Sequence, residues 1–395
     1  MAPAAPLTGR DLNRATLARQ GLLDPIAANA ATAVGRVVSL QAQHPEWPPV
    51  ALAARAADRS AADLAAALAD RSVVRSSLMR NTIHAVHADD LWPMFAVCRQ
   101  LRQDQWRLML KADPVDSPLG RRMSAAHGVA IAALREAPRS SLELDRLMAA
   151  EVGPEATSTT RPTWRQPENR VVVRAAWRHF AAFVPLVHVP WEGEGYGRSR
   201  YQLASDWLGT NGDEPDPATA RVHVARRYLA GFGPASIEDL AAYVGRGKGG
   251  IGVWRDAIAA LGDEVVSLPA DDGRTLVDLA DAPRPSPETP VPPRLLARWD
   301  SLLLSHETKR RGRVIADEHR AAVFTKNADV LPTFLIDGFV AGTWGLTRGD
   351  GSVSVRLRPF AKLPRGSRAK LVAETERVIG ILAPDTNARS VSVEA

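Results

Sequence analysis

The sequence predicts a mainly α protein with β-hairpins, an α+β class in which helices followed by a hairpin recur three times before a β-rich C-terminal segment. Two observations carry this prediction. The spacing of hydrophobic residues changes from helical to alternating at the end of each unit, and stretches rich in Pro, Gly and Ser separate the units. The expected units are residues 1–112, 121–210, 214–282 and 291–395.

The first unit places helices before a hairpin. Valines at helical spacing over residues 34–38 lead to Gln41, so we expect their helix to reach Gln41 and to end before Pro45. Residues 73–78 and 82–86 are rich in β-branched side chains and lie on either side of a short turn, which is typical of a β-hairpin.

The second unit repeats this order less clearly. Helices are expected around Leu134, after Ser140 and over residues 173–180. Two apolar runs, residues 183–189 and 201–203, are expected to form the strands of its hairpin.

The third unit and the C-terminal segment carry stronger signals. Asp216 before Pro217 indicates a helix start, Ser236 indicates another, and strands are expected at residues 265–268 and 276–279. In the C-terminal segment we expect strands at 333–346, 352–359 and 390–393, with a helix over 367–382. Helices followed by a hairpin are the outline of a winged helix, here repeated three times.

Composition excludes several classes of protein. Hydrophobic residues make up 45% of the 395 residues, which is too many for a disordered chain. The single cysteine, Cys98, excludes a disulfide framework and cysteine-ligated metal centres. Residues 1–12 show no signal pattern, and no apolar run approaches the roughly 20 residues of a membrane span. We therefore expect a soluble, cytoplasmic protein without a metal or organic cofactor.

The net charge is +6, and 44 of the 50 basic residues are arginine because lysine occurs at only six positions. Guanidinium groups match phosphate and guanine edges well. The same bias follows from genome composition, so it supports nucleic-acid binding only weakly.

The pair Gln41 and Gln43 is the candidate catalytic feature. On the expected helix, Gln41 would point inward, where a buried amide must find partners or line a wet cavity. Taken alone, the two residues are explained more simply by a satisfied core amide and a surface glutamine.

Five blocks of sequence resemble the bacterial family of tandem winged-helix proteins that includes the AlkZ-type DNA glycosylases. They span nearly the whole chain in order: Ser39-Leu-Gln-Ala-Gln-His-Pro45, Arg75-Ser-Ser-Leu-Met-Arg-Asn-Thr-Ile-His-Ala-Val86, Phe232-Gly-Pro-Ala-Ser236, Leu302-Leu-Leu-Ser-His306 and Asp337-Gly-Phe-Val-Ala-Gly-Thr-Trp344.

The resemblance implies three winged helices and a C-terminal β-barrel wrapped around double-stranded DNA. It also implies excision of bulky or crosslinking alkyl adducts of purines, in DNA repair or in self-resistance to a genotoxin. The family's Gln-aliphatic-Gln catalytic motif is matched by Gln41, Ala42 and Gln43. Two departures stand out: Asn81 replaces a common Gly, and Glu307-Thr308 replaces a common Asp-Arg pair after His306, which puts a family role for His306 in doubt.

The chemistry of two glutamines can be argued without the family. Their amides are neutral near pH 7, so they orient water and stabilise developing charge but cannot act as ordinary bases. That suffices when the leaving group is already activated. N7-alkylguanine and N3-alkyladenine are cationic bases whose glycosidic bonds are weakened in advance, so we expect these lesions to be the substrates.

Two motifs that resemble ligand sites are explained more simply by structure. His84 and His87 have a metal-like spacing, but residues three apart on a strand face opposite sides and cannot share one ion. His84 is therefore expected to be structural, although it can lie near Gln41. The Gly-rich run at 245–250 lacks the Ser or Thr of a phosphate loop and is expected to join two helices.

Three basic stretches are candidates for contact with DNA, and a solvated surface is the equal alternative. Their side chains are Arg161, Arg165, Arg170, Arg174, Arg178, Lys309, Arg310, Arg311, Arg313, Arg348, Arg356 and Arg358. Arg170, Arg174 and Arg178 are four residues apart and would share one helix face. The family resemblance implies that the hairpin at 346–353 probes the minor groove. Trp47 could stack on a base, although core packing is the better interpretation.

Two other functions stay open from the sequence. A non-catalytic winged-helix regulator would bind undamaged DNA and release no base, whereas a protein-interaction scaffold would show no salt-sensitive DNA affinity. Internal repetition favours a monomer.

Overall fold

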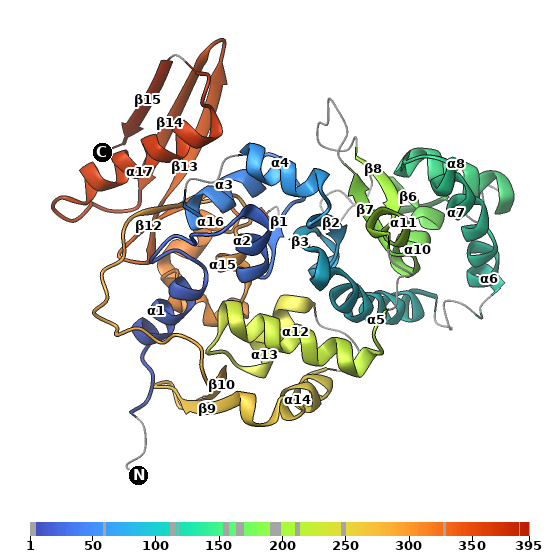
Figure 1. Ribbon diagram of the computed structural model, residues 1–395, viewed down its shortest axis with the longest axis horizontal. Coiled ribbons are helices and arrows are strands. Elements are labelled where there is room, and N and C mark those ends of the chain that lie inside the picture. The colour runs from blue at the N-terminus through green and yellow to red at the C-terminus, as the bar shows by residue number, and fades with distance from the viewer. Residues whose placement is uncertain are drawn as a thin grey trace.

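The computed structural model describes residues 5–57, 61–110, 116, 118–152, 158–162, 170–189, 199–209, 214–245, 250–326, 329–386 and 388–394. Helices and strands are mixed along the chain, and the C-terminal sheet and the second helical region lie at opposite ends of the molecule (Figure 1). The first and third helical regions lie between them. The predicted α+β class is confirmed at the level of a mixed α/β fold.

The first region forms the centre of the molecule (Figure 1). Its elements are α1 (Gly9–Arg19), α2 (Ala30–Arg36), β1 (Leu40–Gln41), α3 (Trp47–Arg55), α4 (Ala61–Ala69), β2 (Val73–Ser77), β3 (Ile83–His87) and α5 (Leu91–Leu110). The predicted hairpin is confirmed as β2 and β3. The helix predicted to reach Gln41 is wrong, because α2 ends at Arg36 and Val38 takes a left-handed conformation with φ 75°. Gln41 therefore lies in a strand.

The described part of the second region contains three further strand pairings. Its elements are α6 (Pro118–Ala125), α7 (His127–Glu136), β4 (Arg139–Ser140), α8 (Ser141–Val152), β5 (Ser158–Pro162), β6 (Arg170–Arg174), α10 (Ala175–Phe183), β7 (Leu186–Val189), β8 (Arg200–Leu203) and α11 (Ala204–Leu208). The predicted helix face of Arg170, Arg174 and Arg178 is wrong. The first two residues bound strand β6, which pairs with β5, and only Arg178 lies in a helix.

The third region follows the sequence prediction closely. It contains α12 (Pro217–Phe232), α13 (Ile237–Val244), α14 (Gly252–Ala259), β9 (Val265–Pro269) and β10 (Thr275–Leu279). Asp216 caps α12 by accepting from the backbone N–H groups of Ala218 and Thr219, and Ser236 forms a capping box with Asp239 at the start of α13. Of the Gly-rich run, residues 246–249 lie outside the described part of the chain.

The C-terminal region carries the second large sheet. It contains β11 (Arg294–Leu296), α15 (Ser301–Leu304), α16 (Arg320–Val323), β12 (Thr333–Ile336), β13 (Phe339–Gly349), β14 (Ser352–Pro359), α17 (Ser367–Leu382) and β15 (Ala388–Val393). The strand order is β11-β12-β13-β14-β15, with β15 parallel to β14. In the described residues β11 and β15 do not pair, so this sheet is open and the expected barrel is not seen.

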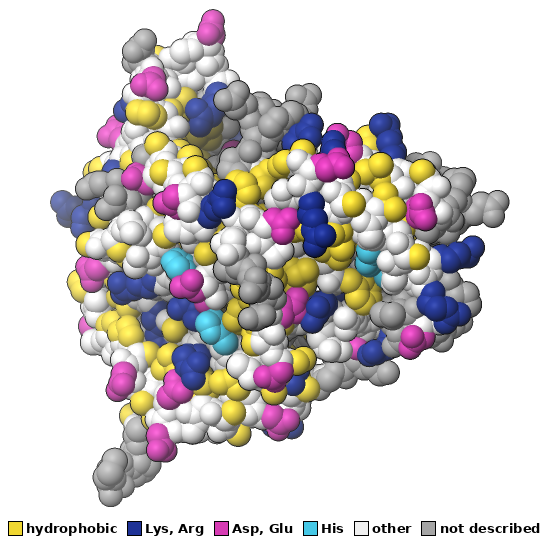
Figure 2. All heavy atoms as spheres, turned by 45° about the vertical axis from the view of Figure 1, so that its right-hand side comes forward, with side chains coloured by type: hydrophobic (Ala, Val, Ile, Leu, Met, Phe, Trp, Pro, Cys, Tyr) yellow, Lys and Arg dark blue, Asp and Glu magenta, His cyan; other side chains and the backbone are white. Residues whose placement is uncertain are grey.

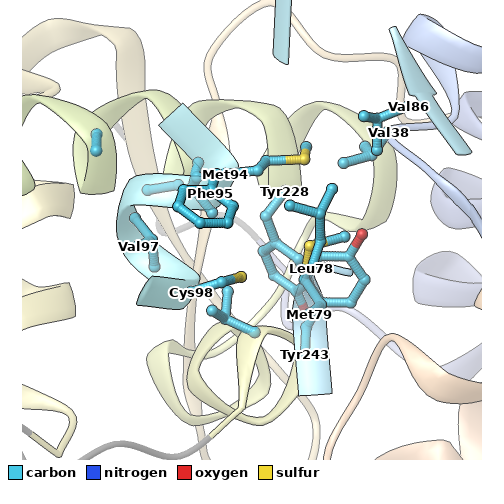
Figure 3. Close-up of a cluster of buried hydrophobic side chains, with 14 of the residues drawn as sticks. Val38, Leu78, Met79, Val86, Met94, Phe95, Val97, Cys98, Tyr228 and Tyr243 are labelled. Atoms are coloured by element: carbon cyan, nitrogen blue, oxygen red, sulfur yellow. The ribbon is translucent and has the colours of Figure 1, made fainter. Parts of the chain in front are cut away.

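One sheet and one core cross the expected unit boundaries. Strands of the first two regions join in the order β1-β3-β2-β7-β8-β4. Side chains from α5, α12 and α13, including Phe95, Cys98, Tyr228 and Tyr243, fill a common core (Figure 3). The division into four units, and with it the winged-helix assignment, stays a prediction.

Candidate active site

Gln41 lies in strand β1, and Gln43 lies just beyond the end of that strand. Leu40 pairs with Ala85 and Gln41 with His84 of β3, and the Ala42 N–H donates to the Ile83 carbonyl at 2.8 Å. Successive strand residues point to opposite faces. Leu40 and Ala42 are buried in the core shared with the C-terminal sheet, so Gln41 belongs to the other face.

The backbone fixes both amide groups through their oxygens. Gln41 Oε1 accepts from the Gln43 N–H at 2.9 Å, and Gln43 Oε1 accepts from the Ile83 N–H at 3.2 Å. Gln41 is 8% exposed and Gln43 is half-buried. Because each oxygen has a second lone pair, each retains one acceptor site, and neither amide nitrogen donates to a described residue. Two oriented amides thus keep bonding capacity for a bound molecule.

His84 is an uncharged neighbour of these amides. Its imidazole is fully buried, with Nδ1 3.0 Å from the Thr82 carbonyl and Nε2 3.5 Å from Arg80 Nη2. Burial, together with the charge of Arg80, lowers the pKa of His84 to about 3. The expected structural role fits this position. His84 and His87 both lie in β3, three residues apart. They therefore face opposite sides of one strand, as expected for two histidines that do not share a metal ion.

Arg80 lies at the tip of the β2–β3 hairpin in a left-handed conformation, with φ 53°. Its guanidinium donates to the Tyr243 carbonyl and lies 5.4 Å from the centroid of the Tyr243 ring. The Tyr243 hydroxyl is 2.8 Å from Ser39 Oγ, and Ser301 Oγ donates to the Ser39 carbonyl at 3.0 Å. These contacts tie the segment before Gln41 to α13 and α15.

A cleft of about 630 Å³ opens beside this network. It is lined by Arg80, Ala242, Gly245, Leu304, His306, Glu307, Thr308, Lys309, Arg311 and Arg320. Four of these side chains are cationic and one is acidic. Over the face shown in Figure 2, basic side chains are interspersed with Asp and Glu side chains.

His306 is a buried wall of the cleft. It is 2% exposed, with Nδ1 2.9 Å from Ser305 Oγ and Nε2 3.2 Å from the Phe232 carbonyl. Burial and Arg313 lower the pKa of His306 to about 3, so it is neutral at physiological pH.

The arginines of residues 310–313 have different surroundings. Arg310 lies 3.2 Å from a carboxylate oxygen of Glu238 and 3.5 Å from one of Glu307. Arg313 is 4% exposed and donates to the Pro234 carbonyl. Both hold the protein fold together rather than face solvent. Arg311 lines the cleft.

The remaining sequence-predicted residues are scattered. Arg178 and Arg348 are exposed, the latter at the β13–β14 turn, while the side chains of Arg170 and Arg174 lie outside the described residues. Trp47 is half-buried and packs edge-on against Trp344 at 5.8 Å between ring centroids, which agrees with core packing. Neither Arg80 nor Arg320 was predicted from the sequence to contact DNA or substrate. Arg80 lies within the family-like segment at residues 75–86, but only the fold brings it to the cleft.

In the described part of the chain, no cluster of three or more His, Cys, Asp or Glu side chains could hold a metal ion. No helix in those ranges is long and apolar enough to cross a bilayer.

Comparison with known families decides the class of the protein. The family model for DNA glycosylase AlkZ-like proteins matches residues 34–380. The chain belongs to the AlkZ-like DNA glycosylase family. Its enzyme class is therefore that of a DNA glycosylase, as the resemblance in sequence implied.

Matches in sequence and in structure extend over nearly the full length of this AlkZ-like glycosylase. The interstrand DNA cross-link repair glycosylase of Streptomyces sahachiroi is 26% identical over 376 residues, which cover 92% of this chain and 94% of that protein. The solved structure of the Streptomyces sahachiroi DNA glycosylase AlkZ superposes with a TM-score of 0.78 at 21% identity, covering 99% of this chain and 100% of that one. The second comparison shows a shared fold.

Proposed function

We propose that this AlkZ-like glycosylase hydrolyses the N-glycosidic bond of N7-alkylguanine and N3-alkyladenine in double-stranded DNA, with Gln41 and Gln43 as its catalytic residues. The observation that carries the proposal is the pair of amides whose oxygens are held by backbone N–H groups. Groups fixed in advance stabilise a transition state without reorganising.

The reaction balances without an acid or base side chain. The C1′–N bond breaks, its electron pair neutralises the positive charge of the alkylated purine, and a water oxygen attacks C1′. The remaining lone pair of each Oε1 can accept a hydrogen from that water, and the negative end of each amide dipole favours the cationic sugar. The water loses its proton to solvent, leaving an abasic site and a neutral alkylated base.

Bulky and crosslinked adducts are the lesions we favour within this class. The Streptomyces sahachiroi relative is named as an interstrand DNA cross-link repair glycosylase, and the match covers 92% of this chain. An N7–N7 guanine crosslink is chemically two N7-alkylguanines, so one excision event separates the strands.

The test is base release from a duplex that carries one N7-alkylguanine, followed by cleavage of the abasic site with alkali. We expect Gln41→Ala and Gln43→Ala to lower the single-turnover rate by roughly 100-fold or more, since each removes a preorganised polar group. Both variants should still bind a duplex containing a tetrahydrofuran abasic analogue. Gln100→Ala, which removes a half-buried glutamine from α5, is the matched control.

A second arm uses a duplex joined by one N7–N7 guanine crosslink and measures strand separation on a denaturing gel. Unchanged base release by both glutamine variants would remove the mechanism. DNA binding without release of any base would instead favour a non-catalytic DNA-binding protein.

A further inference from the structure

Three arginines from distant parts of the chain converge on the cleft. Arg80 comes from the β2–β3 hairpin tip, Arg311 from the 3-10 turn Thr308–Arg313, and Arg320 from the start of α16. Lys309 lines the same cleft. Glu307 is the one acidic side chain among the lining residues, and its Oε2 lies 3.5 Å from Arg310 Nε.

The charges of the cluster are poorly neutralised by the protein. Arg311 donates to the His306 carbonyl at 3.3 Å and lies 4.6 Å from the centroid of the Phe324 ring, so its described contacts carry no formal negative charge. Burial and the neighbouring Arg320 and Arg80 lower the pKa of Arg311 to about 10, which still leaves it cationic at pH 7.

Arg320 has donors to spare. Its Nη2 lies 3.0 Å from an oxygen of Asp317, a carboxylate whose side chain is 81% exposed. Nε of Arg320 is a buried atom that makes no hydrogen bond to the described residues. Buried donors without hydrogen-bond partners are rare in proteins, and a bound anion or water is one explanation for them.

We propose that Arg80, Arg311 and Arg320 form a binding site for one backbone phosphate of DNA, and that this contact places the neighbouring damaged nucleotide at Gln41 and Gln43. A phosphodiester carries one negative charge on two oxygens and accepts paired bonds from guanidinium groups. Arg80 connects the cluster to the glutamines, because its Nη2 lies 3.5 Å from His84 Nε2 and His84 pairs with Gln41. The positioning part of this inference rests on the proposed function, whereas phosphate binding does not.

The test combines a variant of Arg320 with DNA in which one backbone phosphate is replaced by an uncharged analogue. Arg320→Gln is compared with Arg320→Lys and with Arg365→Gln, the last removing an exposed arginine before α17. Fluorescence anisotropy measures binding to a duplex with a tetrahydrofuran site, in which single phosphates beside that site are replaced by uncharged methylphosphonates. Thermal unfolding confirms that each variant is folded.

For the wild type, one methylphosphonate should weaken binding roughly tenfold. Arg320→Gln should weaken binding by a similar factor, and the same methylphosphonate should then cost clearly less binding than it does in the wild type. The slope of log K against log salt should fall by about 0.9 for Arg320→Gln and stay unchanged for Arg320→Lys and Arg365→Gln.

Three results would overturn the proposal. Arg320→Gln could behave like Arg365→Gln, or its effect and that of every methylphosphonate could be additive. Calorimetry could also show that inorganic phosphate binds the wild type and not Arg320→Gln while the DNA salt slope is unchanged, which would assign the cluster to free phosphate. Because these measurements need no base release, a failure of the proposed catalytic function would be seen separately, in the excision assay.

Discussion

Gln41 and His84 lie directly opposite each other in the β1–β3 ladder, and the imidazole beside the glutamine is uncharged. The Thr82 carbonyl can only accept, so Nδ1 of His84 carries the proton and Nε2 presents its lone pair to the Arg80 guanidinium. An imidazolium would set an N–H group against that cation. The neutral tautomer therefore adds no positive charge where a cationic sugar is expected to form.

Excision of N7-alkylguanine should be nearly independent of pH between about 5.5 and 8.5. Glutamine amides do not titrate in this range, and the pKa values of His84 and His306 are both lowered to about 3. The measurement is the single-turnover rate constant, corrected for spontaneous base loss from the same oligonucleotide. An inflection near pH 6.5, the ordinary pKa of histidine, would show that a histidine takes part as acid or base.

The free energy of unfolding should fall as the pH drops from about 6.5 towards 4. Burial lowers the pKa of His84 and His306 to about 3 and that of His127 to about 4. Over this pH range these histidines therefore bind protons in the unfolded chain and stay neutral in the folded chain. The contribution of these histidines to the free energy of unfolding is fully present above the pKa that they have in the unfolded chain. It is lost on acidification, by up to about 1.4 kcal/mol per pH unit for each proton.

Thermal unfolding over this range measures the effect. His84→Gln, which removes one titrating group, should show a shallower dependence than the wild type. Equal slopes for the two proteins would contradict the assignment of a lowered pKa to His84.

Sequence predicted the elements that local rules decide. The caps at Asp216 and Ser236 and the alternation in β13 and β14 are set within a few residues, and these elements are confirmed. The strand that contains Gln41 was missed because it depends on pairing with β3, some 40 residues later, and on the left-handed turn at Val38. No periodicity in residues 34–41 carries that information.

The roles of the arginines near the candidate site also could not be told apart from the sequence. Sequence treats Arg310, Arg311 and Arg313 alike, whereas the fold pairs the first with carboxylates, sets the second on the cleft and buries the third. Arg80 and Arg320 are separated by 240 positions, so only the tertiary structure brings them together.

Asp300→Ala should lower the free energy of unfolding by about 3–5 kcal/mol, because it leaves the buried Arg55 guanidinium without its counter-charge. Asp300 accepts from Arg55 at 2.9 and 2.5 Å and caps α15, which leads to the cleft. The double variant Arg55→Met with Asp300→Asn removes both charges, and its free energy of unfolding should fall much less. Urea denaturation measures the free energy of unfolding of both proteins. An equal decrease in the single and the double variant would contradict a penalty for an unpaired buried charge.

Replacing Asn81 by Gly should destabilise the protein less than replacing it by Ala. It has φ 57°, and its side chain bonds Arg102 at 2.9 Å and Gln105 at 2.8 Å. Both Asn81→Gly and Asn81→Ala remove these bonds, so their difference isolates the backbone. We expect Asn81→Ala to be less stable by about 1–2 kcal/mol, the strain of a Cβ in the left-handed region. Indistinguishable denaturation midpoints would show that the turn relaxes.

Among the sequence-predicted DNA contacts, Arg348 should matter more than Arg310. Arg348 is exposed at the β13–β14 turn and makes no ion pair with a described residue, whereas Arg310 is already matched by Glu238 and Glu307. Arg348→Gln should therefore lower the slope of log K against log salt on duplex DNA by about 0.9, and Arg310→Gln should leave that slope unchanged. Anisotropy titrations between low and moderate salt give both slopes. The opposite order would mean that the ion pairs of Arg310 open on binding and that the hairpin stays away from the phosphates.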